Sequence, residues 1–168
     1  MTEPPASSDT APNPRPVFIH GTLCATQLLA WVLTGDASRT DDIKHLICPA
    51  RAENIARHSL HGRDYPAAVK EPGSFTTGYL LRPQTRSQRK KLDDFEGEAY
   101  QVTAIEVSLL DDTAEAVETG IGADIYIWNG EEHLVSDQAW DLQWFIRERL
   151  EDWLDLFGGM EMIGDVDE

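Results

Sequence analysis

The sequence predicts one α+β domain in which helices flank a curled, mixed sheet. Three observations support this fold class. The apolar patterns follow the order strand, helix, several strands, helix, two strands, helix, which is typical of a mixed domain. The 168 residues suffice for one domain with a substantial core. A hydrophobic fraction of 41% and five tryptophans indicate a folded chain rather than a disordered one.

The predicted domain spans residues 16–158. Residues 1–15 are rich in Pro, Ala, Ser and Thr and show no periodicity, so we expect a disordered leader there. Residues 159–168 follow a glycine pair and form an acidic tail. The chain has no internal repeat.

The net charge is −16, and it is unevenly distributed along the chain. Residues 1–92 contain 12 Lys and Arg against 8 Asp and Glu, whereas residues 93–168 contain 2 against 22. This acidity argues against nucleic-acid binding, which needs a basic surface. The acidic residues of the second half indicate a well-solvated surface. An alternative is that the basic residues of the first half attract an anionic small-molecule substrate.

The sequence also predicts where the protein resides. No apolar run approaches the length of a membrane span, and the N-terminus lacks the apolar core of a signal peptide. Cys24 and Cys48 form no pair at metal-ligand spacing, and we expect both to be reduced thiols. We therefore expect a cytoplasmic protein that does not bind membranes. The oligomeric state stays open.

The first half of the chain begins with a buried strand over Val17–Ile19. A short helix over Ala25–Leu33 follows and ends near Gly35. The next residues have strand-like patterns interrupted by Pro and Gly. Short strands are predicted at 45–48, 54–60 and 66–69, a turn at 71–74, and a longer strand at 75–81.

The second half contains a predicted pair of strands and a long helix. Alternation predicts a strand over Tyr100–Leu110, and the return strand covers Ala114–Trp128. A last helix is predicted from Ser136 or Asp137 to about Phe157. We interpret its stripe of Trp and aliphatic residues as core packing, because that spacing is far more common in cores than in ligand sites.

One carboxylate stands out at the end of a predicted helix over Thr85–Asp94. Its N-cap Thr and Gln88 fit a capping box, and Gly97 closes it or turns the chain away. Glu96 lies between the bulky Phe95 and this glycine. Such surroundings can raise the pKa of a carboxylate and make it a usable acid or base.

A second feature is the glycine that ends the first strand. A strand, a tight turn at Gly21 and a helix start leave several backbone N–H groups unpaired. Such groups can hold a carboxylate or a developing oxyanion. From the residues alone, an ordinary turn with a glycine for steric reasons is the simpler interpretation.

Three segments together resemble the gamma-glutamylcyclotransferase-like family, which includes avirulence-induced plant proteins and gamma-glutamylamine cyclotransferases. The family has a strand ending in Tyr-Gly-Ser or Tyr-Gly-Thr, and this chain has His20-Gly21-Thr22-Leu23. Its Leu-Asp-x-Phe-Glu-Gly-x-x-Tyr motif is complete here from Leu92 to Tyr100. Gly62 to Ala67 is similar to the Gly-x-x-Tyr-Pro-Ala segment. The resemblance covers about residues 16–128.

The resemblance implies a small mixed β-barrel with helices outside it and a γ-glutamyl cyclotransferase activity that releases 5-oxoproline. It implies that Glu96 is the catalytic acid and base and that no cofactor or metal is needed. It further implies that one group of residues binds substrate: His20, Gly21, Thr22, Leu23, Tyr65, Tyr100 and Tyr126. Each tyrosine fits equally well as a core residue with a satisfied hydroxyl.

Two other functions stay open at this point. A protein of the same fold can use Glu96, with His20, for cyclisation, elimination or isomerisation of a non-glutamyl compound. Near pH 7 an imidazole is either charged or neutral, so His20 is a candidate anion binder or second proton carrier. The alternative is that it only fills the place of the family's Tyr. The other function is a non-catalytic ligand-binding module.

Two further site types are excluded by sequence patterns. A strand followed by His-Gly also occurs in α/β-hydrolases, but the chain has no Gly-x-Ser-x-Gly motif. His58 and His61, with Cys48, do not have a zinc-site spacing, and we interpret them as structural residues.

Overall fold

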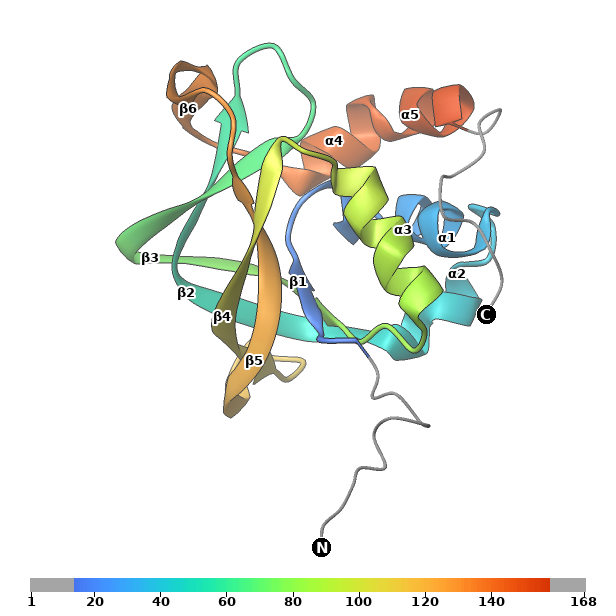
Figure 1. The fold of residues 1–168 in the computed structure, drawn as a ribbon, viewed down its shortest axis with the longest axis horizontal. Coiled ribbons are helices and arrows are strands. Elements are labelled where there is room, and N and C mark those ends of the chain that lie inside the picture. Colours follow the sequence, from blue (N-terminus) through green and yellow to red (C-terminus); the bar gives the residue numbers. More distant parts are fainter. Residues whose placement is uncertain (1–13, 158–168) are drawn as a thin grey trace, which may run out of the picture.

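The computed structural model describes residues 14–157, which form a mixed α+β fold (Figure 1). The strands of the sheet are β1 (Val17–Ile19), β2 (Ile47–Leu60), β3 (Pro66–Leu81), β4 (Tyr100–Leu110), β5 (Ala116–Trp128) and β6 (Val135–Ala139). The α-helices are α1 (Thr26–Thr34), α2 (Thr40–Ile43), α3 (Arg86–Glu96), α4 (Leu142–Glu148) and α5 (Leu150–Phe157). Short 3₁₀ turns are η2 (Thr22–Cys24), η3 (Lys44–Leu46) and η4 (Glu132–Leu134).

The six strands form one sheet in the order β3-β1-β5-β4-β2-β6, and β2 also pairs with β3. This additional pairing turns the sheet back on itself and gives a partial, barrel-like ring. The ring is weakest between β1 and β5, which are parallel and share a single paired position, Val17 with Asp124. The α+β fold with a small barrel and outer helices is therefore confirmed.

The short strand β1 separates two hydrophobic clusters. Phe18 belongs to the cluster inside the ring, with residues of β2 to β5. Val17 and Ile19 belong to the cluster between the sheet and the helices. Side chains alternate between faces along a strand, and a strand covered on both faces is apolar throughout. All three side chains are buried, which stabilises the fold by about 1.5–3 kcal/mol each.

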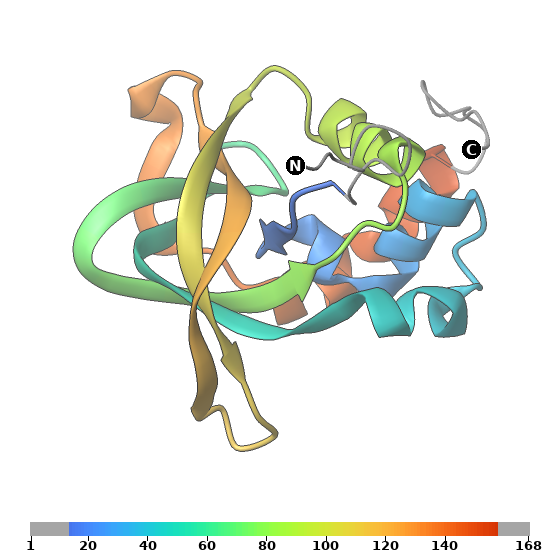
Figure 2. The ribbon, with the colours of Figure 1, turned by 60° about the horizontal axis from the view of Figure 1, so that its bottom comes forward.

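The helices α1, α3, α4 and α5 gather on one side of the barrel (Figures 1 and 2). α1 buries its whole central stretch, from Leu28 to Leu33. It ends at Gly35, whose left-handed φ of 83° closes the helix as a C-cap. This helical layer covers the end of β1 and therefore surrounds the turn that follows it.

Five predicted elements are confirmed to within about two residues at each end. These are the strands β1, β4 and β5 and the helices α1 and α3. Residues 1–13 of the predicted leader, which spans residues 1–15, and the tail at 159–168 lie outside the described residues. Arg15 is described and pairs with Asp124 at 2.9 Å. No helix within residues 14–157 is long and apolar enough to cross a membrane.

The predicted short strands between residues 45 and 81 are wrong. They are two long strands, β2 and β3, that pair over most of their length. The predicted turn at 71–74 is an irregularity inside β3, opposite Asn54. The Asn54 side chain accepts a hydrogen bond from the Gly73 N–H at 3.0 Å, and both residues have positive φ. Turn residues here produce a bulge rather than a strand end.

The single long C-terminal helix is also wrong. Ser136 and Asp137 lie in strand β6, which pairs with β2, and the helical segment starts only after Asp141. The Asp141 side chain caps it by accepting from the Gln143 N–H at 3.0 Å. The helix is then interrupted at Arg149, which separates α4 from α5.

Candidate active site

A cavity of about 390 Å³ lies between the barrel and the helical layer. Its size falls within the range of small-molecule sites. All residues that the sequence predicted for catalysis or substrate binding line it: His20, Gly21, Thr22, Leu23, Tyr65, Glu96, Tyr100 and Tyr126. The fold thus brings together residues from β1, the loop before β3, α3, β4 and β5.

The turn after β1, residues 20–23, supplies one side of the cavity, and we call it the glycine turn. A Cβ atom at Gly21 would lie 3.0 Å from the Pro66 side chain, so a side chain there requires the proline ring to shift by a few tenths of an ångström. Thr22 begins the 3₁₀ turn η2. Within residues 14–157, no hydrogen bond is donated by the backbone N–H of Gly21, Thr22 or Leu23. These groups remain available to a ligand.

A partly buried arginine supports this turn from behind. Arg57 on β2 donates a hydrogen bond from Nη1 to the His20 carbonyl at 2.6 Å. Its guanidinium also lies 5.4 Å from the centre of the Trp140 ring. In a trans peptide the C=O and the following N–H point in opposite directions. The bond to His20 therefore fixes the direction of the Gly21 N–H. The sequence carries no local signal for this contact, because Arg57 lies 37 residues from His20.

His20 lines the cavity but is not a titrating group near neutral pH. Its side chain is 6% exposed and stacks on Phe18, with ring centres 6.1 Å apart. Burial, and then the charge of Arg57, lower the pKa of His20 to about 3. The ring is therefore neutral at pH 7. Of the two interpretations of His20, these surroundings favour the neutral ring that fills the place of the family's Tyr, because a cation has no solvation here.

Helix α3 delivers Glu96 to the other side of the cavity. The Thr85 hydroxyl accepts from the Gln88 N–H at 3.0 Å, and the Gln88 side chain accepts from the Gln84 N–H at 2.7 Å. The helix ends at Gly97, with φ 77° and ψ −168°, a conformation that is essentially restricted to glycine. The start of α3 is therefore fixed by the residues around Thr85, and its end is fixed by the glycine of the Leu92–Tyr100 motif.

Glu96 has the most perturbed carboxylate at the cavity. Loss of solvation, and then the negative charge of Asp93, raise the pKa of Glu96 to about 8. The side chain is only partly accessible to solvent. A carboxylate with such a pKa is a far stronger base than an ordinary Glu and exchanges protons near neutral pH.

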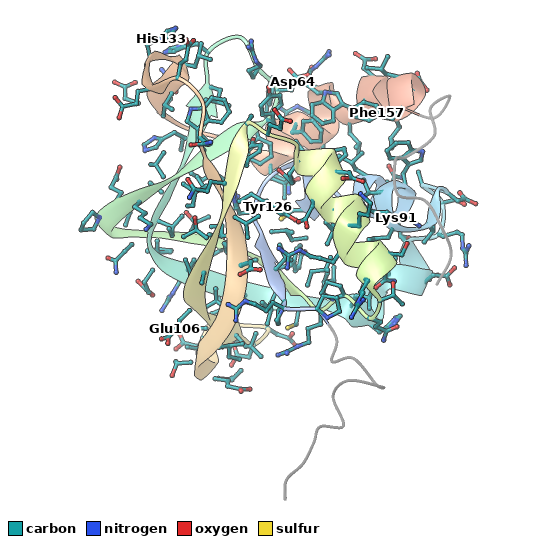
Figure 3. The ribbon with its side chains drawn as sticks, viewed as in Figure 1. Asp64, Lys91, Glu106, Tyr126, His133 and Phe157 are labelled. Atoms are coloured by element: carbon teal, nitrogen blue, oxygen red, sulfur yellow. The ribbon has the colours of Figure 1, made fainter. Side chains whose placement is uncertain are left out.

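Asp93 connects α3 to the barrel through a polar network. It accepts hydrogen bonds from the Tyr126 hydroxyl at 2.6 Å and from Arg89 at 3.0 Å. Arg89 also pairs with the largely buried Asp124 on β5 at 2.9 Å. Figure 3 shows Tyr126 in the space between β5 and α3. The network links α3 to β5 beside Glu96, and it was missed because its members on the two elements lie far apart in the chain.

The other two tyrosines line the cavity with their rings. The Tyr100 hydroxyl donates to the Pro66 carbonyl at 2.7 Å. The Tyr65 hydroxyl accepts from Arg63 at 3.1 Å. Burial raises the pKa of Tyr100, so it stays neutral. The two rings meet edge to face at 6.4 Å and form an ordered apolar surface.

The C-terminal aromatic stripe is core only in part. Trp140 and Leu150 are buried, as predicted, whereas Ile146 is exposed. Trp153 and Phe157 pack against the core but are only partly buried, and they also line the cavity. The spacing of four residues places both on one face of α5, but only the tertiary structure shows that this face borders a cavity.

The histidines outside the cavity have structural partners or are exposed. His58 lies 3.2 Å from Glu71, and His61 is at the surface. In the part of the chain that the structure describes, no group of three or more His, Cys, Asp or Glu is arranged to hold a metal ion.

Comparison with known proteins places this geometry in a family. A family model described as gamma-glutamyl cyclotransferase, AIG2-like, matches residues 17–142. The AIG2-like protein D of Arabidopsis thaliana is 25% identical over 127 residues, which are 76% of each chain.

Two solution structures of Arabidopsis thaliana proteins share the fold. One has a TM-score of 0.58 at 19% identity and covers 87% of this chain and 81% of its own. The other has a TM-score of 0.55 at 18% identity, with coverage of 85% and 87%. The chain belongs to the gamma-glutamyl cyclotransferase, AIG2-like family.

Proposed function

We propose that this protein is a γ-glutamyl cyclotransferase that converts a γ-glutamyl amide into 5-oxoproline and a free amine. The substrate carries both reacting groups. Its α-amine attacks its own γ-carbonyl, a C–N bond closes the five-membered ring, and the original amide C–N bond breaks. The reaction needs no redox change or co-reactant. The α-ammonium loses two protons as it becomes the lactam N–H: one completes the leaving amine, and the other is taken up by that amine or by solvent.

Glu96 carries out both proton transfers in this proposal. An ordinary Glu is too weak a base to take a proton from an ammonium group, whereas a pKa of about 8 makes the transfer accessible. The protonated Glu96 then donates to the leaving nitrogen. The raised pKa of a motif Glu inside a small cavity is the observation that carries the proposal.

The glycine turn supplies the second half of the chemistry. The backbone N–H groups of Gly21, Thr22 and Leu23 bind the substrate carboxylate or the oxygen of the tetrahedral intermediate. Each such donor typically contributes about 10²- to 10³-fold to the rate in other enzymes. Folding the substrate into a reactive shape adds further acceleration, because amine and carbonyl are held at close range.

An alternative that uses His20 as a second proton carrier has no support from its surroundings. A pKa of about 3 leaves His20 neutral and unable to gain a proton at neutral pH. Acid/base work at the cavity therefore depends on Glu96.

The test is release of 5-oxoproline from a panel of γ-glutamyl amides. We expect turnover by the wild type and a loss of at least about a hundredfold in Glu96→Gln, which keeps the shape of the side chain but cannot accept the proton. Glu98→Gln is the matched control, because Glu98 is exposed just beyond the helix. A folded Glu96→Gln enzyme with normal turnover contradicts the assignment of Glu96, and absence of 5-oxoproline from every compound contradicts the proposed reaction.

A further inference from the structure

Four aromatic side chains of the cavity have no part in the chemistry at Glu96. They are Trp31 on α1, Phe95 on α3, and Trp153 and Phe157 on α5. Trp31 and Phe157 stack with ring centres 5.4 Å apart, and Trp153 meets Phe157 at 5.5 Å. Phe95 contacts both rings of α5, at 6.5 and 6.0 Å. We call this surface the aromatic wall.

The wall is held in place by polar contacts on its outer side. The Asp64 carboxylate accepts hydrogen bonds from the Trp153 indole at 2.8 Å and from Arg149 at 2.9 Å. The Asp64 carbonyl accepts from the Trp140 indole at 2.7 Å. Figure 3 shows Asp64 beside the C-terminal helices, with Phe157 farther along α5. Because these contacts order Trp153 before a ligand arrives, the wall binds with little further loss of entropy.

The charges around the cavity restrict what can contact the wall. The lining residues include Asp94 and Glu96 but neither Lys nor Arg. A leaving amine that carries a carboxylate, such as an amino acid, would lose its solvation without gaining a cationic partner.

A cationic leaving amine is also disfavoured. Asp94 already pairs with Lys90 at 3.3 Å. The cavity removes enough solvent from Glu96 to raise its pKa strongly, and the same loss of solvent penalises a second positive charge beside the substrate ammonium.

We propose that the leaving amine of the substrate carries an uncharged, apolar aryl or alkyl group that packs against the aromatic wall. This inference rests on the proposed γ-glutamyl cyclotransferase activity and adds the class of amide that is cleaved. The wall provides contact area to an apolar group, and apolar contacts in such pockets discriminate by about 10- to 200-fold per group.

Four substrates test this class. They are the γ-glutamyl derivatives of benzylamine, methylamine, alanine and cadaverine, which offer an aromatic, a minimal, an anionic and a cationic leaving group. We expect kcat/KM for the benzylamide to exceed each of the others by at least about tenfold. Preference for the alanine or cadaverine derivative overturns the proposal, as does equal turnover of all four.

Binding to Glu96→Gln, measured by calorimetry, separates this inference from the proposed reaction. If the wild type releases no 5-oxoproline, the reaction is wrong. Tighter binding of the benzylamide by at least about tenfold still supports an apolar site. Binding of the benzylamide that is equal to or weaker than binding of the other three derivatives overturns the proposal of an apolar site.

A variant on the wall has a matched control on the same helix. Phe157→Arg places a cation at the cavity, and we expect the preference to shift at least about tenfold from the benzylamide toward the alanine derivative. Leu156→Arg introduces the same charge at a neighbouring position that is 66% exposed and outside the cavity, and it should leave the preference unchanged. Phe157→Ala, a smaller change to the fold, should lower turnover of the benzylamide more than turnover of the methylamide. Unchanged preference in both folded Phe157 variants overturns the proposal.

Discussion

His20, at the glycine turn, and Glu96, at the end of α3, line the same cavity from two different elements. Both side chains have lost solvent, yet the consequences are opposite. Burial removes the charged form of the imidazole and lowers its pKa to about 3, so His20 is silent at neutral pH. The same loss of solvent raises the pKa of Glu96 to about 8, where a carboxylate is a useful base.

The neighbours strengthen this contrast. Arg57 lies behind His20 and opposes a second positive charge. Asp93 lies beside Glu96 and opposes a second negative charge. One cavity therefore inactivates a histidine and activates a carboxylate by the same physical effect. A catalytic assignment from residue type alone would favour His20, the usual acid/base residue near pH 7.

The largest effect we expect is on the pH dependence of turnover. Because only ionised Glu96 accepts a proton, kcat/KM should rise about tenfold for each pH unit below the Glu96 pKa and level off above about 8. A pH–rate profile on the best γ-glutamyl amide measures this. If the rising limb of this profile lies near pH 4.5, the ordinary Glu pKa, the raised pKa of Glu96 is contradicted.

Asp93→Asn is the control that assigns the limb. It removes the neighbouring charge, so the Glu96 pKa falls and the limb moves to lower pH. A limb caused by the substrate ammonium would not move.

The second expected effect is on stability. The pKa of Glu96 is raised in the folded state, so the wild type is stabilised fully below the unfolded value of about 4.5 and loses this contribution as pH rises through about 8. Glu96→Gln does not titrate. It should therefore gain stability relative to the wild type, by up to about 1.4 kcal/mol for each pH unit in that window.

Thermal unfolding of the two proteins between pH 5 and pH 9 measures the difference. A gap that stays constant with pH would show that Glu96 is not desolvated in the folded protein. Glu98→Gln should follow the wild type at every pH, because Glu98 is exposed.

The third expected effect concerns the backbone side of the comparison. Arg57→Met removes the hydrogen bond to the His20 carbonyl and leaves the Gly21 N–H less well oriented. Loss of a whole oxyanion donor costs about 10²- to 10³-fold, so loss of its orientation should lower kcat by about tenfold.

Arg57→Lys, which keeps a donor, should recover part of the activity if the role is positioning. Arg51→Met, on the same strand but outside the cavity, is the matched control. An unchanged kcat in folded Arg57→Met would assign Arg57 a purely structural role.

Local patterns predicted the elements that carry the motifs. The apolar run at β1, the cap at Thr85 and the alternation in β4 each depend on neighbouring residues, and each appears in the structure. The long β2–β3 pair was missed because Asn54 and Gly73, typical turn residues, meet across the strands at a bulge. Sequence spacing cannot distinguish a turn that ends a strand from a bulge inside a longer strand.

The candidate site divides in the same way. Motifs identified the residues of the glycine turn and Glu96, whereas Arg57, Asp93 and Trp153 act through contacts across the fold. The protonation state of His20 could not be predicted from the sequence either, since it depends on burial in the folded protein. Pairs far apart in the chain leave no local signal.

The smallest effect we expect is from His20→Tyr, which restores the residue found in the family motif. His20 is neutral and packs against Phe18, so the exchange replaces one uncharged ring by a larger one. Overpacking should cost about 1–3 kcal/mol of stability. The pH–rate profile should keep its limb near 8, because no proton passes through the imidazole, and kcat/KM should stay within about threefold.

Kinetics on the four γ-glutamyl amides across pH 5–9 measure both quantities. A moved limb, or a changed order of preference among the amides, would show that His20 takes part in proton transfer or in substrate selection despite its burial. That result would require the cavity to admit water or substrate to the imidazole, and it would remove the contrast between the two residues.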